Sequence, residues 1–351
     1  MERTRSRHHL LLRELPGLTQ ALIRARIPYL PVHADHIDLH AAQFSSLVLP
    51  NLGAMSDAQV ASVRRFVAGG GGLVATGESS RFNEWGDPRP DFALADLFGA
   101  HIADPHGEED ESRRRKSASD TAHTYLRLNP ELRARVNGPQ IGTEPPVTSE
   151  RHEVLRGFEE TDILPFGGVL ERLRVDAGAQ ALMSFVPAFS IYPPETAWMR
   201  EPKTNIPGLI VHSSAGGGHI AFLPADCDRR YAKDNLPDHG NLLANLVRWA
   251  AKDAIPLSVE GAGLIDCHLY HQPQRLILHL VNLTSAGTWR QPVDELISIG
   301  PLHVRVKLPA DVSGERARLL VSGKAVSAST VAGWSRFEVK SILDHEVSVI
   351  G

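Results

Sequence analysis

Short apolar runs bounded by glycine, proline and polar residues alternate with helical periodicity in the first two thirds of the chain. The run 44–52 (FSSLVLPNL) predicts a buried strand, and 72–77 (GLVATG) predicts a second one. Between them, residues 56–70 place valines along one helical face, with Ser56 as the N-cap and glycines at the end. A strand, a helix and a strand in this order predict a right-handed βαβ unit of a parallel sheet.

Further elements surround this unit. The apolar face of residues 14–26 predicts a helix, whereas the proline-rich run 27–34 is a poor candidate for a central strand. Residues 209–226 predict two strands joined by a glycine-rich turn, which leads into no helix and is therefore not a phosphate loop. A helix is predicted over 239–253. Residues 104–122 carry opposing charge blocks without aromatics, which predicts a mobile surface loop.

The pattern changes at about residue 255. Apolar and polar residues then alternate with period two, and the alternating runs are 264–272, 275–283, 303–308, 317–323 and 337–342. No helical segment interrupts them, so this part predicts a small all-β sandwich. We therefore expect two domains: an α/β domain with a parallel sheet over residues 1–254, and a C-terminal β sandwich over residues 255–351.

Composition excludes several classes of protein. A hydrophobic content of 42% and a charged content of 22% are typical of globular domains. The net charge of −4 gives no field that would attract nucleic acid or an anionic membrane. No apolar run is long enough for a signal peptide or a membrane span, so we expect a cytoplasmic protein. Cys227 and Cys267 form no CxxC pair and are expected to be small buried residues.

Two blocks of the α/β domain resemble a known family. LVLPNLGAMSDAQVASVRRFVAGGGGLVATGES, followed by FNEWGDPRPDFALADLFG, resembles the trimerisation domain of family 42 β-galactosidases. GGGHIAFLPADCDRRYAKDNLPDHGNLLANLVRWAA is similar to the end of that domain. LILHLVNLT and SILDHEVSV are similar to the small β domain of uncharacterised bacterial glycoside-hydrolase-like proteins. The resemblance implies a class I glutamine amidotransferase-like (flavodoxin-like) fold, followed by a β domain.

The resemblance also sets the functional expectation. In those relatives a TIM barrel with two catalytic glutamates precedes this region, and the two domains here leave no room for the roughly 250 residues of a barrel. We therefore expect a non-catalytic assembly or carbohydrate-associated protein, a subunit or fragment of a glycoside hydrolase. Its expected partners are itself, in a homo-oligomer such as a trimer, or a separate TIM-barrel subunit, with a saccharide as a further ligand. A truncated piece of a longer glycosidase is a third interpretation, because only RHHLLLREL stands where a first strand is usual.

The turn after the second predicted strand carries the main chemical argument. Amidotransferases need a cysteine on this turn, where backbone N–H groups stabilise its thiolate. Here ATGESS (75–80) holds Gly77 and Glu78, so glutamine hydrolysis by that route is excluded and no catalytic residue is predicted. A nearby helix N-terminus would lower the pKa of Glu78, which favours ligand holding over general-base work. The rival hypothesis is a hydrolase that acts on a carbohydrate through a cleft at Glu78.

Other side chains are candidates for contacts with a ligand or partner. They are Ser79, Asn83 and Trp85 after this turn, Tyr192, Trp198 and Arg200 in a proline- and aromatic-rich loop, and Asp226 and Asp228 at another strand end. Aromatic faces stack on sugars or fill a partner's pocket, although they can equally cover the sheet. For the two aspartates, a structural salt-bridge cluster with neighbouring arginines is the alternative interpretation.

The histidines invite a metal hypothesis at one place. His33, His36 and His40 lie close together, and the last two would share one face of a helix. The segment contains no HExxH motif, so a capping turn is the favoured interpretation. We predict no metal site and no cofactor.

Overall fold

The computed structural model describes residues 17–103, 123–133, 151–170, 172–190, 192–199, 201, 203–285 and 295–351. Contacts divide the chain into two compact units. One unit comprises Met1–Leu18 and Val32–Asp253, and the other comprises Thr19–Pro31 and Ala254–Gly351. The predicted loop over 104–122, the stretch before residue 16 and Arg200 lie outside the described residues.

The helical segments of the first unit are short apart from α3, α8 and α9. They are η1 (Ala34–His36), α2 (Ile37–His40), η2 (Ala41–Gln43), α3 (Asp57–Ala68), α4 (Ala95–Phe98), α7 (Pro130–Arg133), η3 (Glu153–Leu155), η4 (Pro194–Thr196), α8 (Cys227–Asp234) and α9 (Pro237–Ala250). Residues 17–24 are also helical. In the part of the chain that the structure describes, no helix combines the length and the apolar character needed to cross a membrane.

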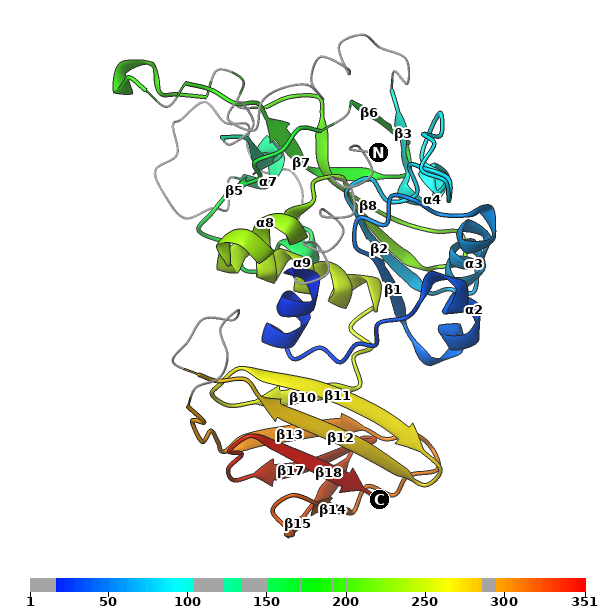
Figure 1. Cartoon of the computed structure of the whole chain (residues 1–351), viewed down its shortest axis with the longest axis vertical. Helices are drawn as coiled ribbons and strands as arrows, with labels where there is room; N and C mark the ends of the chain where they lie inside the picture. Colours follow the sequence, from blue (N-terminus) through cyan, green and yellow to red (C-terminus); the bar gives the residue numbers. More distant parts are fainter. Residues whose placement is uncertain are drawn as a thin grey trace. The chain divides into compact units, whose positions relative to one another are not determined.

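The strands of the first unit form one large mixed sheet and one small sheet (Figure 1). They are β1 (Ser46–Leu49), β2 (Gly72–Thr76), β3 (Ala100–Ile102), β4 (Tyr125–Leu128), β5 (Ile163–Pro165), β6 (Leu173–Val175), β7 (Gln180–Val186), β8 (Pro207–Ser213) and β9 (His219–Leu223). The large sheet has the order β1-β2-β9-β8-β7-β4-β5, and β3 pairs with β6. Only β1, β2 and β9 are parallel neighbours, and the remaining pairs of the large sheet are antiparallel.

The predicted βαβ unit is confirmed, and local chemistry explains its boundaries. Ser56 caps α3 with a full capping box, because its hydroxyl accepts from the Gln59 N–H while the Gln59 side chain accepts from the Ser56 N–H. The predicted hairpin of 209–226 is also confirmed as β8 and β9. This hairpin is the reason why the sheet turns from parallel to antiparallel beyond β9.

Strand β2 lies between two helical layers. All five of its residues are buried. Leu73 and Ala75 lie in one apolar core together with Val63 of α3, while the hydroxyl of Thr76 bonds to Asp228 of α8. Successive side chains of a strand point to opposite faces, so α3 and α8 cover opposite faces of the sheet, as Figure 1 also shows.

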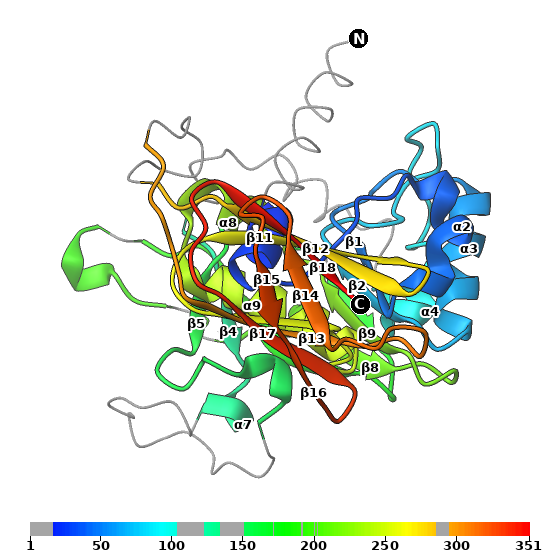
Figure 2. The ribbon, with the colours of Figure 1, turned by 90° about the horizontal axis from the view of Figure 1, so that it is seen from below.

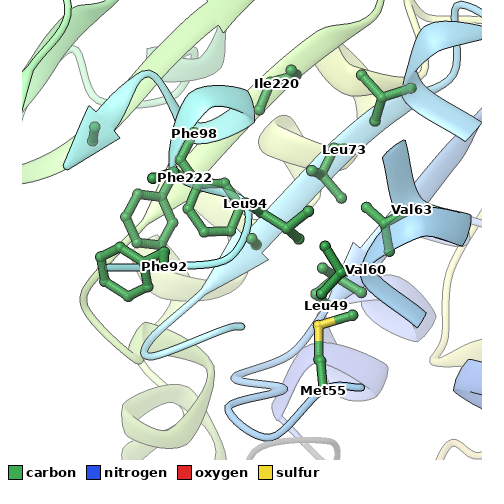
Figure 3. Packing of buried hydrophobic residues seen from close by; sticks show 14 of the residues in the cluster. Leu49, Met55, Val60, Val63, Leu73, Phe92, Leu94, Phe98, Ile220 and Phe222 are labelled. Atoms are coloured by element: carbon green, nitrogen blue, oxygen red, sulfur yellow. The ribbon is translucent and has the colours of Figure 1, made fainter. Parts of the chain in front are cut away.

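The core on the α3 face is rich in aromatic rings (Figure 3). Phe98 of α4 stacks on Phe222 of β9 with a ring-centroid distance of 4.2 Å, and Phe92 meets Phe222 edge-on at 5.3 Å. Helix α4 ends immediately at Gly99, whose φ of 63° is a conformation that glycine adopts without strain. The packing of Phe98 on β9 therefore anchors the C-terminal end of the loop that follows β2.

All strand pairs of the second unit are antiparallel. Its strands are β10 (Leu257–Glu260), β11 (Ile265–Gln272), β12 (Arg275–Asn282), β13 (Leu302–Lys307), β14 (Arg316–Leu319), β15 (Ala325–Ser327), β16 (Ser329–Val331), β17 (Trp334–Val339) and β18 (His345–Ile350). They form sheets of order β10-β13-β17-β16 and β11-β12-β18-β14-β15, which share one apolar core. The predicted fold class, an α/β domain followed by a β sandwich, is confirmed.

The sequence predicts residues 19–31 to belong to the first domain, and the structure differs from this prediction. Their contacts group them with the second unit. The guanidinium of Arg26 donates to the carbonyl oxygens of Val259, Gly261 and Gly263 at 2.7–2.8 Å. Tyr29 packs its ring against His268. A single side chain that binds three carbonyl groups is a tertiary contact with no local sequence signal.

Candidate functional site

The carboxyl ends of β1, β2 and β9 lie along one edge of the large sheet. Ligands of open α/β sheets bind outside this edge, so a site is expected here. One backbone N–H group and two polar side chains link the strand ends. The Asn51 N–H donates to the Thr76 hydroxyl at 3.0 Å, and this hydroxyl donates to Oδ2 of Asp228, also at 3.0 Å.

The turn after β2 has a geometry that suits its glycine. Gly77 has a φ of 59°, and a Cβ added there would lie 2.4 Å from Oδ1 of Asn51. The same Asn51 oxygen accepts from the Glu78 N–H at 2.7 Å. The turn is therefore built around the Asn51 side chain, and Glu78 is held with its side chain exposed to solvent.

The two serines of the turn are part of the interior. Ser79 is fully buried, and its hydroxyl lies within hydrogen-bond distance of the Leu49 and Thr76 carbonyl groups while accepting from the Leu52 N–H. Ser80 is also buried, and its hydroxyl accepts from the Leu94 N–H. Both hydroxyls hold loops together, so of the two binding candidates on this turn only Glu78 faces solvent.

The loop after the turn presents a tryptophan. Asn83 closes the loop, because its side-chain oxygen accepts from the N–H groups of Trp85 and Asp87 and its amide donates to the Asp87 carboxylate. Gly86 donates to the Asn83 carbonyl. The Trp85 side chain is 84% exposed. Asn83 thus acts as a structural turn residue, whereas Trp85 remains available for contact with a ligand or partner.

The aspartates after β9 have separate roles. The Asp226 carboxylate accepts from Nε and Nη2 of Arg229 at 2.5 and 3.0 Å, which is the predicted salt bridge. Asp228 is fully buried, and its Oδ1 accepts no hydrogen bond. Burial and the nearby Asp226 charge raise the pKa of Asp228 to about 7, although the Thr76 hydrogen bond opposes the shift.

Cys227 lies between these aspartates, and its neighbour Asp228 contacts the end of β2. Its thiol is fully buried, and burial raises its pKa well above the ordinary value, with the Asp226 charge adding to the effect. A reactive cysteine needs exposure and a lowered pKa. Cys227 has neither, which agrees with the prediction that both cysteines are buried and unpaired.

The aromatic loop leaves the same edge of the sheet, between β7 and β8. Tyr192 is 81% exposed and Trp198 is 51% exposed. The structure contains a cavity of about 630 Å³ where this loop begins and ends, lined by Phe185, Leu173, Ile206, Arg172, Lys203 and Glu201 among others. None of the eight predicted site residues that the structure describes lines it.

Sequence reasoning missed this cavity and the bonded pair of Thr76 and Asn51. Asn51 directly follows a predicted strand, and a polar residue at the carboxyl end of a parallel strand is a signal that could have singled it out. The cavity residues come from distant segments without a shared pattern. Among the described residues, no group of three or more histidine, cysteine or acidic side chains is placed to hold a metal ion.

The fold thus comprises an α/β unit with a partly parallel sheet and an antiparallel β unit. No protein-family model matches the chain. No curated protein matches its sequence.

Solved structures do match the fold. The chain is similar to α-L-fucosidase isoenzyme 2 from Paenibacillus thiaminolyticus, with a TM-score of 0.64 and 16% identity over 95% of this chain and 44% of that one. For the β-galactosidase from Bacillus circulans sp. alkalophilus, the TM-score is 0.56 and the identity is 14%, over 95% of this chain and 37% of that one. For Gan42B, a GH42 β-galactosidase from G. stearothermophilus, the TM-score is 0.52 and the identity is 15%, over 95% of this chain and 35% of that one.

These likenesses confirm the predicted resemblance at the level of fold. Almost the whole chain, both units included, corresponds to part of each enzyme, and it spans less than half of their length. At 14–16% identity the comparison concerns architecture, and it transfers no activity to any residue of this chain.

Proposed function

We propose that this chain is a non-catalytic assembly or carbohydrate-associated component of a glycoside hydrolase system. The observation that carries the proposal is the extent of the fold likeness: 95% of the chain matches 35–44% of three glycosidases. A chain that corresponds to a minor part of such enzymes is expected to support a catalytic part located elsewhere. Its partner is then a second copy of itself or a separate TIM-barrel subunit.

The chemistry at the strand ends supports a non-catalytic role. Glycosidases use two carboxyl groups that flank the bond to be cleaved, at separations of about 5–10 Å. Of the three acidic candidates, Asp228 is fully buried and Asp226 is bonded twice to Arg229, so only Glu78 faces solvent. Among the three acidic candidates, Glu78 therefore has no exposed second carboxyl group of the kind that this mechanism needs.

Self-assembly is the first testable consequence. We expect the purified chain to form a homo-oligomer at micromolar concentration, measured by size-exclusion chromatography with multi-angle light scattering and by sedimentation velocity. A trimer would correspond to the assembly named in the predicted resemblance. A monomer at every concentration tested would contradict self-assembly, and binding to a barrel-type glycosidase would then be the remaining form of the proposal.

The rival hypothesis, a carbohydrate hydrolase acting through Glu78, predicts the opposite result in an activity assay. We expect no turnover of nitrophenyl glycosides by this chain above that of a heat-treated sample. Glu78→Gln should leave both the assay and the thermal stability unchanged, because the Glu78 side chain is exposed. Turnover that is present in the wild type and lost in Glu78→Gln would favour the hydrolase.

A further inference from the structure

The connection between β7 and β8 forms an arm, defined here as residues 187–206. Both Figure 1 and Figure 2 show its green outer part, which includes η4, projecting away from the large sheet. Most of its described residues between Pro187 and Asn205 are exposed, and the others are only partly buried. Phe189, near the base of the arm, stacks on Tyr125 of β4 with a ring-centroid distance of 5.8 Å and does cover the sheet. Tyr192 and Trp198 lie farther out and are exposed, so the interpretation of the aromatic residues as a cover of the sheet does not extend to these two.

Hydrogen bonds hold two described parts of the arm. At its outer end, Thr196 donates to the Pro193 carbonyl through both its N–H and its hydroxyl, at 2.9 and 3.1 Å. The Trp198 N–H donates to the Thr196 carbonyl at 3.0 Å. At its base, the Phe185 N–H donates to the Ile206 carbonyl at 2.8 Å. A pre-formed segment loses little entropy when it binds, which favours a role in recognition.

Two large aromatic side chains are presented on this ordered outer end. Tyr192 is 81% exposed and Trp198 is 51% exposed. Tryptophan and tyrosine are the residues most enriched among those that dominate binding energy at protein interfaces. Glu195, between them in sequence, is exposed as well.

The cavity at the base of the arm is suited to receive such a group. Its volume of about 630 Å³ is within the range of binding pockets, and Leu173, Phe185 and Ile206 supply apolar lining. Arg172 and Lys203 supply positive charge at the same cavity, and Glu201 supplies one negative charge. Aromatic rings would bury against the apolar lining, and a glutamate beside them would meet a lining with more cations than anions. The outer residues of the same arm are not among those that line the cavity.

We infer that the arm is the self-association element of this chain, and that its outer end docks into the cavity at the base of the arm of a second copy. The inference rests on the proposed self-assembly. Because donor and receptor lie on the same arm, two arms that run antiparallel make both contacts at once. The interface is then two-fold symmetric and closes as a dimer. A trimer in solution would support the proposed self-assembly and overturn this docking.

Introduced cysteines test the docking directly, because both native cysteines are buried. Ala197→Cys marks the outer end, and Ala188→Cys marks the cavity that Ala188 lines. A mixture of the two single variants should form a disulfide-linked heterodimer under mild oxidation, and the double variant should form a closed dimer. No cross-link in the mixture would overturn the inference, as would efficient cross-linking of Ala197→Cys alone. A ladder of higher oligomers from the double variant would overturn the two-fold symmetry.

Removal of the aromatic groups separates this inference from the proposed function. Tyr192→Ser combined with Trp198→Ser should raise the dimer dissociation constant by roughly 30-fold or more. Leu39→Ser, which removes a 73% exposed leucine of α2 in the same unit, should leave it unchanged. If the wild type assembles and the double variant assembles equally well, the arm is not the interface although self-assembly stands. If the wild type is monomeric, self-assembly itself fails.

Discussion

Asp228→Asn is expected to stabilise the first unit at pH 8 by up to about 4 kcal/mol. The wild-type carboxyl is fully buried, and its pKa is raised from 3.8 to about 7 by burial and by the Asp226 charge. Between these two pH values the unfolded chain holds a charged carboxylate while the folded protein holds a proton. Stability is therefore lost as the pH rises from about 4 to about 7, and no more is lost above that. Asparagine is neutral throughout and keeps an oxygen for the Thr76 hydroxyl.

Denaturant unfolding of both proteins from pH 5 to pH 8 measures this effect. The gain in free energy of unfolding from Asp228→Asn should grow with pH and level off above about 7. Asp96→Asn is the matched control. Arg64 holds the Asp96 carboxylate by two hydrogen bonds at 2.6 and 2.7 Å and lowers its pKa, so this variant should lose stability by an amount that is constant over the same range. A pH-independent gain for Asp228→Asn would show that its carboxyl is charged in the folded protein.

The same residue illustrates the limit of the sequence argument. Asp228 was noted as a candidate for sugar binding or for a salt bridge, because it follows a strand and precedes arginines. The structure instead pairs it with Thr76, which lies 152 positions earlier in the chain. Contacts of this range depend on the order of strands in the sheet, and the apolar pattern of single strands does not encode that order. For the same reason, the sequence does not predict the structural role of Ser79.

The elements themselves could be predicted because their signals are local. Ser56 and Gln59 mark the start of α3 by a box of four residues, and the glycines after Ser214 mark the β8–β9 turn. The period-two pattern of the C-terminal strands needs only neighbouring residues to be recognised. By contrast, the cavity at the base of the arm combines residues of β6, β7 and the returning arm. No periodicity links these segments, so a site there could be found only in three dimensions.

Glu346→Ala is expected to destabilise the second unit by about 2–4 kcal/mol, since a hydrogen bond to a charged group contributes roughly 1.5–3 kcal/mol. The Glu346 side chain belongs to β18 and is 2% exposed. Its carboxylate accepts from the N–H groups of Val321 and Val347 through Oε1 at 2.8 and 2.9 Å, and from the Ser322 N–H through Oε2 at 3.1 Å. It therefore fastens the turn after β14 onto β18.

The protonation state of Glu346 makes the prediction specific to a carboxylate. Burial raises its pKa, but the hydrogen bonds from Val321, Ser322 and Val347 outweigh burial, so the net pKa is lowered. A lowered pKa contributes stability that is present above the ordinary value of 4.5 and is lost as the pH falls through the folded value. Glu346→Gln should accordingly cost about 2 kcal/mol near neutral pH, because its amide turns a donor toward the Ser322 N–H.

Calorimetric unfolding, together with hydrogen exchange of β14 and β18, measures the loss in the second unit. Glu338→Ala on β17 is the control, since this glutamate is exposed and its removal should change the free energy of unfolding by no more than about 0.5 kcal/mol. Equal effects of the two alanine variants would mean that the Glu346 hydrogen bonds are replaced by water without cost. Faster exchange confined to residues around 319–323 and 346–348 would instead show that one buried carboxylate holds this turn on β18.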